Sequence, residues 1–228
     1  MYIYDFFNHT EKIEEKASDK KQLLTKKFNR TDNFINLALY GAQKCVGEMV
    51  LHKKSSIYLA SRNGNMNTTF KVLEAIFLEN KLPMPFNFLN SVNAAKLFYI
   101  AKSFEVEGKT LFVDRFESAL PQAFVDVQND KTVLVGAVKE VISDLTVHLE
   151  YFAAEAMEEE SRWLLLSRII ENQEALAYIS NMQFGGYGEE NAIAMLFKFL
   201  DEGKVGDHFT FKGYNLSFDV EKLKAKES

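Results

Sequence analysis

The chain has 228 residues, of which 47% are hydrophobic, and a formal net charge of −5. This length and composition predict a packed globular protein and exclude a disordered chain. The acidic balance argues against nucleic-acid binding, because the densest basic stretch, KKQLLTKKFNR, lies beside acidic EKIEEK and resembles a solvated helical face.

The first part of the chain predicts strands that alternate with helices. The short aromatic stretch MYIYDFF is typical of a first strand. A helix is expected from about Asp32, a candidate N-cap, in DNFINLALYGAQKCVGEMVL, and SSIYLAS follows as a buried strand. The polar turn SRNGNMNTT leads into the helix TTFKVLEAIFLEN, for which Thr68 or Thr69 is the candidate cap.

Prolines interrupt the next stretch. KLPMPFNF is expected to be non-helical, because Pro83 and Pro85 restrict the residues before them to extended geometry. A helix then runs from about Ser91 to Ser103, KTLFVD is a third strand, and FESALPQAFVDVQ is the next helix. Pro121 either lies in the tolerant first turns of that helix or kinks it. DKTVLVGAVKEV is the fourth strand.

The pattern changes beyond Glu150. YFAAEAMEEE is expected to be a polar-rimmed loop or a short helix, and SRWLLLSRI and EALAYISNMQF to be strands joined by the turn IENQ. This connection is too short for a parallel crossover, so at least one of the two strands should run antiparallel. After GGYG, EENAIAMLFKFLDEG predicts an amphipathic helix and GYNLSFDVEKL a closing strand.

These elements predict an α/β fold in a single domain over residues 1–228. We expect a mixed but mostly parallel five-stranded sheet with helices on both faces, because strands that alternate with helices form parallel crossovers. A C-terminal helix and strand extend this core. No stretch is apolar over the roughly 18 residues that span a membrane, and no signal-peptide layout is present, so a cytoplasmic protein is expected.

Motifs for common cofactor and catalytic sites are absent from the sequence. There is no GxxxxGK[ST] or GxSxG, and GGYGEE has neither the position nor the spacing of a dinucleotide fingerprint. The single cysteine, Cys45, lies on an apolar helical face and is interpreted as a small buried hydrophobe. The histidines lack the paired spacing of zinc ligands: His9, His52, His148 and His208. We therefore expect no metal and no cofactor.

The stretch TLFVDRFESAL, residues 110–120, has the pattern of a strand that turns into a helix. Many enzymes place a nucleophile at such a turn, because N–H groups at the helix start lower a thiol pKa or hold an oxyanion. Here Val113, Asp114 and Arg115 occupy the turn, which has no Cys, Ser or Thr. Phosphotransferases with an Asp here need a second Asp two residues later, where Phe116 stands, and Ser118 lies inside the helix.

One loop is a candidate for ligand binding. SRNGNMN offers Arg62, Asn63 and Asn65 as polar contacts. A glycine turn that closes a strand-to-helix connection explains the same residues and is the favoured interpretation.

The order of the segments resembles the N-terminal half of β-ketoacyl synthases, the condensing enzymes with a thiolase-like fold. It is most similar to a short, divergent branch that often lacks the catalytic cysteine. The resemblance covers about residues 25–183 and leaves residues 184–228 as an extension of unknown role. The matching stretches are KKFNRTDNFINLALYGAQKCV, IYLASRNGNMNTTFKVLEAI, PMPFNFLNSVNAAKLFYIAKSF, TLFVDRFESALPQAF, TVLVGAVKE and SRWLLLSRIIENQEALAYISNMQ.

This resemblance implies a degenerate nucleophile elbow at Val113, Asp114 and Arg115. In condensing enzymes a cysteine at this turn forms the acyl thioester, and two histidines, or a histidine and an asparagine, come from the second half. The aligned position is Val113 or Asp114, neither of which can form a thioester. A chain of 228 residues leaves no room for the second half, so a single thiolase-like half is implied.

The resemblance further implies a non-catalytic partner of an active ketosynthase, similar to a chain length factor, in fatty-acid, aryl polyene or polyketide synthesis. The partner would be a ketosynthase or a second copy of the chain, with acyl carrier protein as a further candidate. The edge from Thr110 to Val113 would be the pairing surface. Phe86, Phe112 and Phe116 are candidate lining of an acyl pocket, with an ordinary aromatic core as the alternative.

Two other functions stay open. The first is a diverged acyl-transfer or hydrolytic enzyme that uses Asp114, Ser118 or Arg62, which requires these groups to converge in a pocket. The second is a protein-interaction module without an acyl pocket, which requires solid packing of the Phe residues near the elbow.

Overall fold

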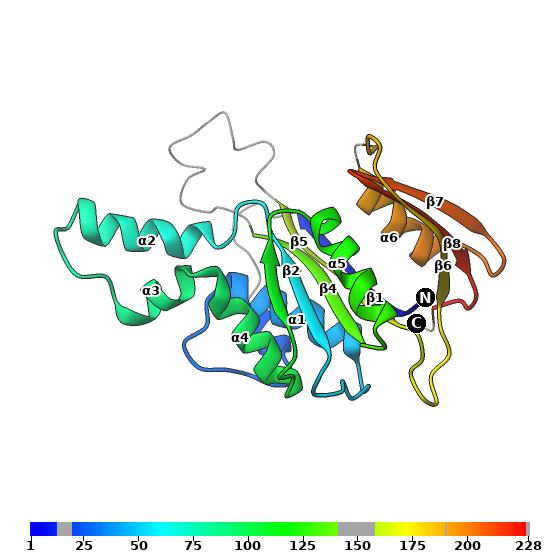
Figure 1. Cartoon of the computed structure of the whole chain (residues 1–228). Helices are drawn as coiled ribbons and strands as arrows, with labels where there is room; N and C mark the ends of the chain where they lie inside the picture. Colours follow the sequence, from blue (N-terminus) through cyan, green and yellow to red (C-terminus); the bar gives the residue numbers. More distant parts are fainter. Residues whose placement is uncertain (13–19, 141–157, 190, 227–228) are drawn as a thin grey trace.

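The computed structural model describes residues 1–12, 20–140, 158–189 and 191–226. Within this part of the chain one mixed sheet of eight strands has the order β3-β2-β4-β5-β1-β6-β8-β7 (Figure 1). The strands are β1 Tyr2–Lys12, β2 Ser56–Ala60, β3 Thr110–Val113, β4 Val133–Lys139, β5 Glu158–Ser167, β6 Ala177–Phe184, β7 His208–Gly213 and β8 Leu216–Lys222. The helices are η1 Lys20–Leu23, α1 Asn33–Val46, α2 Met66–Phe77, α3 Pro85–Ser91, α4 Asn93–Phe104, α5 Phe116–Gln128 and α6 Ala192–Glu202.

The sheet differs from the expected five-stranded, mostly parallel one. Only β2 pairs in parallel, with β3 on one side and β4 on the other, and every other pair in the described sheet is antiparallel. The expectation was wrong because the long strands β1 and β5 pair antiparallel in the middle of the sheet, and because β8 lies antiparallel between β6 and β7. β7 was not predicted; it pairs with β8 across a tight turn in which Asn215 has a φ of 58°.

Helices cover both faces of the sheet, as the sequence predicts. One core forms beneath α5 and α6, and the other beneath α1 and α4. Along β4, Val133 and Val135 enter the first core and Leu134 enters the second. This alternation explains why β4 is apolar at successive positions rather than at every second one.

The first residues of the helices agree with the sequence prediction at α1 and differ from it at α2 and α3. Asp32 is the N-cap of α1, as predicted, and its Oδ1 accepts a hydrogen bond from the Ile35 N–H at 3.0 Å. The cap of α2 is Asn65 rather than Thr68 or Thr69, because the helix begins at Met66, within the stretch that was expected to be a turn. The prediction that KLPMPFNF is non-helical is wrong in its second half, where Pro85 opens α3.

Two further expectations concern Pro121 and the segment after Glu150. Helix α5 continues through Pro121. Of YFAAEAMEEE, Glu158 to Glu160 belong to β5, and the rest lies outside the described residues. None of the described helices is long and apolar enough to cross a bilayer.

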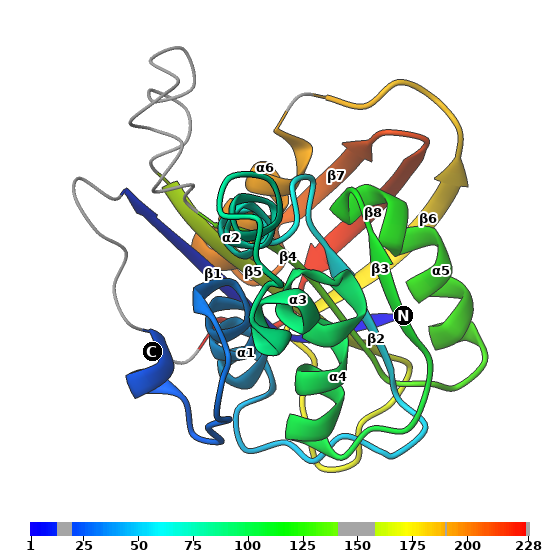
Figure 2. The same ribbon diagram turned by 90° about the vertical axis from the view of Figure 1, so that its left-hand side faces the viewer.

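Helices α2 and α3 project from the body of the molecule, away from the sheet (Figure 1), and point toward the viewer in Figure 2. We call residues 66–91, which contain these two helices, the arm. It exposes an unusual number of large apolar side chains: Leu73, Ile76, Phe77, Leu78, Leu82, Met84, Phe88 and Leu89. An open groove of about 900 Å³ lies along them, lined mainly by apolar residues of the turn between the two helices.

The indole of Trp163 is the largest completely buried side chain and depends on two glycines for its space. A Cβ on Gly136, its cross-strand neighbour, would lie 2.3 Å from the ring, and one on Gly41 of α1 would lie 2.5 Å from it. The Trp163 Nε1–H donates to Ser161 Oγ at 3.0 Å, and Ser161 Oγ donates to the Leu37 carbonyl at 3.1 Å. This contact fixes α1 against β5.

Gly41→Ala should therefore destabilise the fold, although alanine is the better helix former. Overpacking of a rigid core costs about 1–3 kcal/mol, whereas the gain in helix propensity is about 1 kcal/mol. Urea unfolding followed by circular dichroism measures the difference. The double variant Gly41→Ala/Trp163→Phe should lose less stability than the sum of the single variants. Additive losses would mean that the indole is not what limits the space.

Candidate functional site

The segment from β3 through Asp114 and Arg115 into α5 has the strand-to-helix geometry that the sequence predicts. Arg115 is the N-cap of α5, in extended conformation, and its side chain makes no capping hydrogen bond. The first turn of the helix carries Glu117, an acidic residue suited to a helix N-terminus. This turn, which we call the elbow, therefore leads from strand to helix and presents an acid and a guanidinium, without a thiol.

A small pocket of about 190 Å³ lies beside this elbow, at the carboxyl ends of the parallel strands. The structure brings Arg62, Asp114 and Arg115 together in its wall, along with Phe116. Its other charged lining residues come from α5 and from strands β4 and β5: Glu117, Lys139, Glu160 and Arg162.

The polar groups at the elbow contact one another. Asp114 accepts a hydrogen bond from Ser118 Oγ at 3.0 Å and lies 3.6 Å from Arg115 Nε. Asp114, Arg115 and Ser118 are exposed, and Ser118 is not among the residues that line the pocket. The arrangement holds charge at the mouth of the pocket but offers no buried nucleophile paired with a base.

The polar loop Arg62, Asn63 and Asn65 does not form one site. Arg62 and Asn63 are exposed, and Arg62 belongs to the elbow pocket. Asn65 is buried, and its side-chain amide donates to Asp32 Oδ2 at 2.5 Å and to the Asn90 carbonyl at 3.0 Å. Asn65 therefore anchors the start of α2 to its neighbours.

The three candidate pocket phenylalanines lie in different surroundings. Phe116 is buried in the α5–α6 core, edge to face with Phe197 at 5.9 Å between ring centroids. Phe112 packs against the core on the opposite side of the sheet, and the Phe86 ring lies 4.1 Å from the Arg30 guanidinium carbon. They do not line a common pocket.

Cys45 is fully buried in helix α1, as the sequence predicts. Burial raises the pKa of its thiol well above the ordinary value. A thiol held in the protonated form in the core is no substitute for a nucleophile at the elbow.

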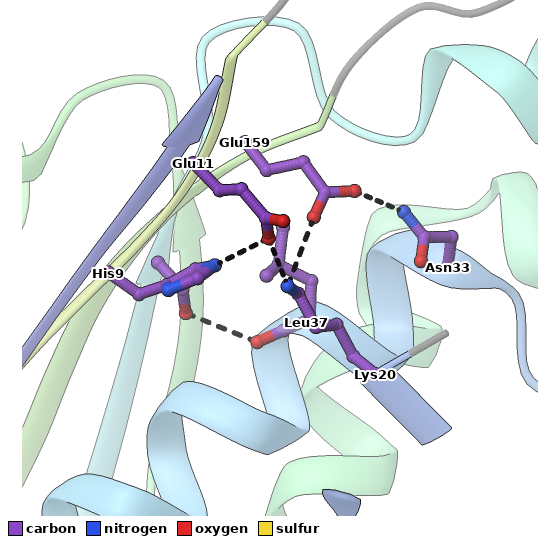
Figure 3. A network of polar contacts seen from close by, with 7 residues as sticks. His9, Glu11, Lys20, Asn33, Leu37 and Glu159 are labelled. Atoms are coloured by element: carbon purple, nitrogen blue, oxygen red, sulfur yellow. Dashed lines mark hydrogen bonds and ion pairs between the residues drawn. The ribbon is translucent and has the colours of Figure 1, made fainter. Parts of the chain in front are cut away.

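Sequence reasoning missed a second polar cluster, which the fold assembles from distant segments (Figure 3). It contains His9 and Glu11 of β1, Lys20 of η1 and Glu159 of β5. Lys20 Nζ lies 2.5 Å from Glu11 Oε2 and 3.8 Å from Glu159 Oε2, and His9 Nε2 lies 3.4 Å from Glu11 Oε2. The available signal was the spacing His-x-Glu, which places both side chains on one face of a strand.

The electrostatics of this cluster follow from its burial. Desolvation raises the pKa of Glu159, an effect opposed by a hydrogen bond from Asn33 and by the charge of Lys20. Desolvation and then the Lys20 charge lower the pKa of His9, although Glu11 opposes this. Nearby, at the end of β4, burial raises the pKa of Glu140 to about 7.

A third polar group, Lys96 of α4, lies completely buried at the base of the arm. Its ammonium donates to the Ser91 carbonyl at 3.3 Å and to Asn93 Oδ1 at 3.0 Å, and it lies 5.4 Å from the centre of the Phe34 ring. Burial lowers its pKa to about 8, against the opposing charges of Asp32 and Glu140. This cation therefore costs folding energy at neutral pH.

Comparison with known proteins identifies the fold. No protein-family model and no curated protein sequence matches the chain. A chain of the ketosynthase ApeO in complex with its chain length factor ApeC, from Xenorhabdus doucetiae, matches with a TM-score of 0.63 at 17% identity over 96% of this chain and 98% of that chain.

Two further ketosynthase structures match over shorter shares of their chains. A chain of AntDE:AntF, a type II polyketide synthase acyl-carrier protein in complex with its ketosynthase bound to the hexaketide, matches with a TM-score of 0.65 at 12% identity, over 81% of this chain and 68% of that one. A chain of the ishigamide ketosynthase/chain length factor matches with a TM-score of 0.59 at 11% identity, over 74% of this chain and 53% of that one. The resemblance in fold to β-ketoacyl synthases is thus confirmed.

Stability should rise with pH between about pH 8 and pH 10.5 because of Lys96. In this range the unfolded chain still binds a proton that the folded chain has lost, so the free energy of unfolding increases with pH. We expect about 1 kcal/mol from this residue after solvent screening, measured by urea unfolding at each pH. Lys96→Met should lack this part of the rise, whereas Lys71→Met, at an exposed position of α2, should keep it. Equal slopes for both variants would contradict the assignment.

Proposed function

We propose that this protein is a non-catalytic partner of an active β-ketoacyl synthase, acting as a chain length factor does, in fatty-acid, aryl polyene or polyketide synthesis. The observation that carries the proposal is the elbow. Strand β3 leads directly into helix α5, the setting in which many enzymes place a nucleophile, while Val113, Asp114 and Arg115 supply neither thiol nor hydroxyl.

The chemistry of the condensation reaction supports a non-catalytic role. A condensing enzyme holds its acyl group as a thioester, which needs a thiolate at the start of the helix. The single thiol of the chain, Cys45, is buried in α1, and Ser118 of α5 donates a hydrogen bond to Asp114 at an exposed position. Neither group can take over the missing step.

The comparisons support a partner role. The match to a chain from a ketosynthase–chain length factor complex extends over nearly the whole of both chains. It therefore includes the segments outside residues 25–183, where the sequence resemblance ends. A partner that lacks catalytic groups would shape the acyl channel of the active enzyme from across their interface.

The edge of the sheet offers a surface for such a partner. β3 is the last strand on its side of the described sheet, and Thr110 and Leu111 are exposed. Unpaired strand edges are ready to pair with another chain. Helices α4 and α5 flank β3 and add the exposed apolar side chains Phe98 and Val125. The apolar groove of the arm is a second surface that a partner would cover.

A second copy of the chain could use the same edge, and a diverged acyl-transfer or hydrolytic enzyme could use the elbow pocket. The only support for the enzymatic alternative is that Arg62 and Asp114 line the same pocket. An interaction module without acyl function fits the solid packing of Phe116. The recovered partner distinguishes these three functions.

Affinity purification of the tagged chain from its source cells should recover a full-length ketosynthase in near-equal amount. Leu111→Arg should reduce this recovery at least tenfold, because a buried unpaired guanidinium in an interface costs several kcal/mol. Val205→Arg is the matched control, since Val205 is exposed and lies just before β7, at the opposite edge of the sheet. Circular dichroism confirms that both variants fold. Recovery of the chain alone, or only as a homodimer, would contradict the ketosynthase partnership.

A further inference from the structure

The cluster of His9, Glu11, Lys20 and Glu159 contains two carboxylates that face each other directly. In the antiparallel ladder of β1 and β5, Glu11 is paired with Glu159. Like charges at directly opposed positions repel, so this pairing needs a cation between the two side chains. His9 lies two residues before Glu11 and therefore on the same face of β1.

Glu159 is completely buried and only half satisfied. Its Oε1 accepts a hydrogen bond from Asn33 Nδ2 at 2.7 Å. Its Oε2 is buried and has no hydrogen-bond partner among the described residues, and the ammonium of Lys20 lies 3.8 Å away. His9 Nε2 is a second buried atom without a hydrogen bond in the described part of the chain. Both atoms belong to the group that surrounds the Lys20 ammonium (Figure 3).

The Lys20 ammonium serves the two carboxylates unequally. It lies 2.5 Å from Glu11 Oε2 but 3.8 Å from Glu159 Oε2, which makes no hydrogen bond within the described residues. Burying a carboxylate oxygen without a hydrogen bond is costly. A divalent cation in place of the ammonium would balance the two carboxylates and would also use the imidazole nitrogen and the unsatisfied Oε2 of Glu159.

We propose that His9, Glu11 and Glu159 form a binding site for a first-row divalent cation such as Zn²⁺ or Mn²⁺, from which the metal displaces the Lys20 ammonium. One ligand atom of each residue lies within 4.8 Å of the other two. The 3.4 Å between His9 Nε2 and Glu11 Oε2 equals the edge of a tetrahedron whose ligands lie about 2.1 Å from the metal. One imidazole with two carboxylates is a ligand set that these ions accept, and it leaves a position for water.

The surroundings are those of a supported site. Asn33, the first residue of α1, holds the Glu159 carboxylate by its other oxygen, as outer partners of metal ligands do. The ligands come from two neighbouring strands of a rigid sheet. Lys20 sets the affinity, because the metal must break its ion pairs with Glu11 and Glu159 before it binds.

Titration calorimetry with ZnCl₂ or MnCl₂ alone, on tag-free and chelator-treated protein, tests this site. The wild type should bind one ion, and Lys20→Met should bind at least tenfold more tightly, because the competing ammonium is gone. His9→Ala and Glu159→Gln should each weaken binding at least tenfold. Glu160→Gln is the control, since Glu160 is the next residue of β5, on its other face, and pairs with Arg162 at 3.0 Å.

Two further readouts keep the test decisive. The fluorescence of Trp163 and circular dichroism show whether each variant is folded. If Glu159→Gln does not fold, His9→Ala is the variant that tests the ligand set. Co²⁺ bound to Lys20→Met should give the intense visible absorption of a tetrahedral site. Folded Lys20→Met that binds no tighter than the wild type would overturn the proposal. Metal binding that His9→Ala leaves unchanged would equally overturn it, because the ion would then be held elsewhere.

Discussion

The pairing of β1 with β5 on one side and β6 on the other is the interaction on which the rest of the sheet depends. β2, β3, β4 and β5 form one continuous part, and β6, β7 and β8 form the other. β1 is the only strand of the described sheet that pairs with both parts. Its ladder with β5 runs from Tyr2 to Lys12, whereas its ladder with β6 involves only Tyr2 and Ile3. The C-terminal part is therefore attached through a short stretch of backbone, supported by the packing of α6 against the common core.

This arrangement explains which features could be predicted from the sequence. Elements with strong local signals were found: the helix capped by Asp32, the apolar strand β4, and the strand-to-helix turn at Asp114. The strand order could not be predicted, because the partners of β1 lie at the other end of the chain and no local pattern identifies them. Pro85 was misjudged because proline is excluded from helix interiors but favoured at a helix start.

The candidate sites show the same division. The elbow was recognised because its residues are contiguous in the sequence. The cluster around Lys20 was missed, because His9 and Glu159 become neighbours only through the β1–β5 register. The sheet separates two of the candidate pocket phenylalanines. Phe112 and Phe116 are close in sequence, yet they pack on opposite faces of the sheet. Side chains that are close in the sequence can therefore belong to different cores when the sheet separates them.

The position of β1 has a consequence for how the chain is made. The ribosome synthesises this strand long before β5 and β6, so both edges of β1 remain unpaired until those strands emerge. Contacts that close such long loops form slowly and leave strand edges open to incorrect association. The two parts of the sheet therefore cannot join before β6 has been synthesised, however early β1 emerges.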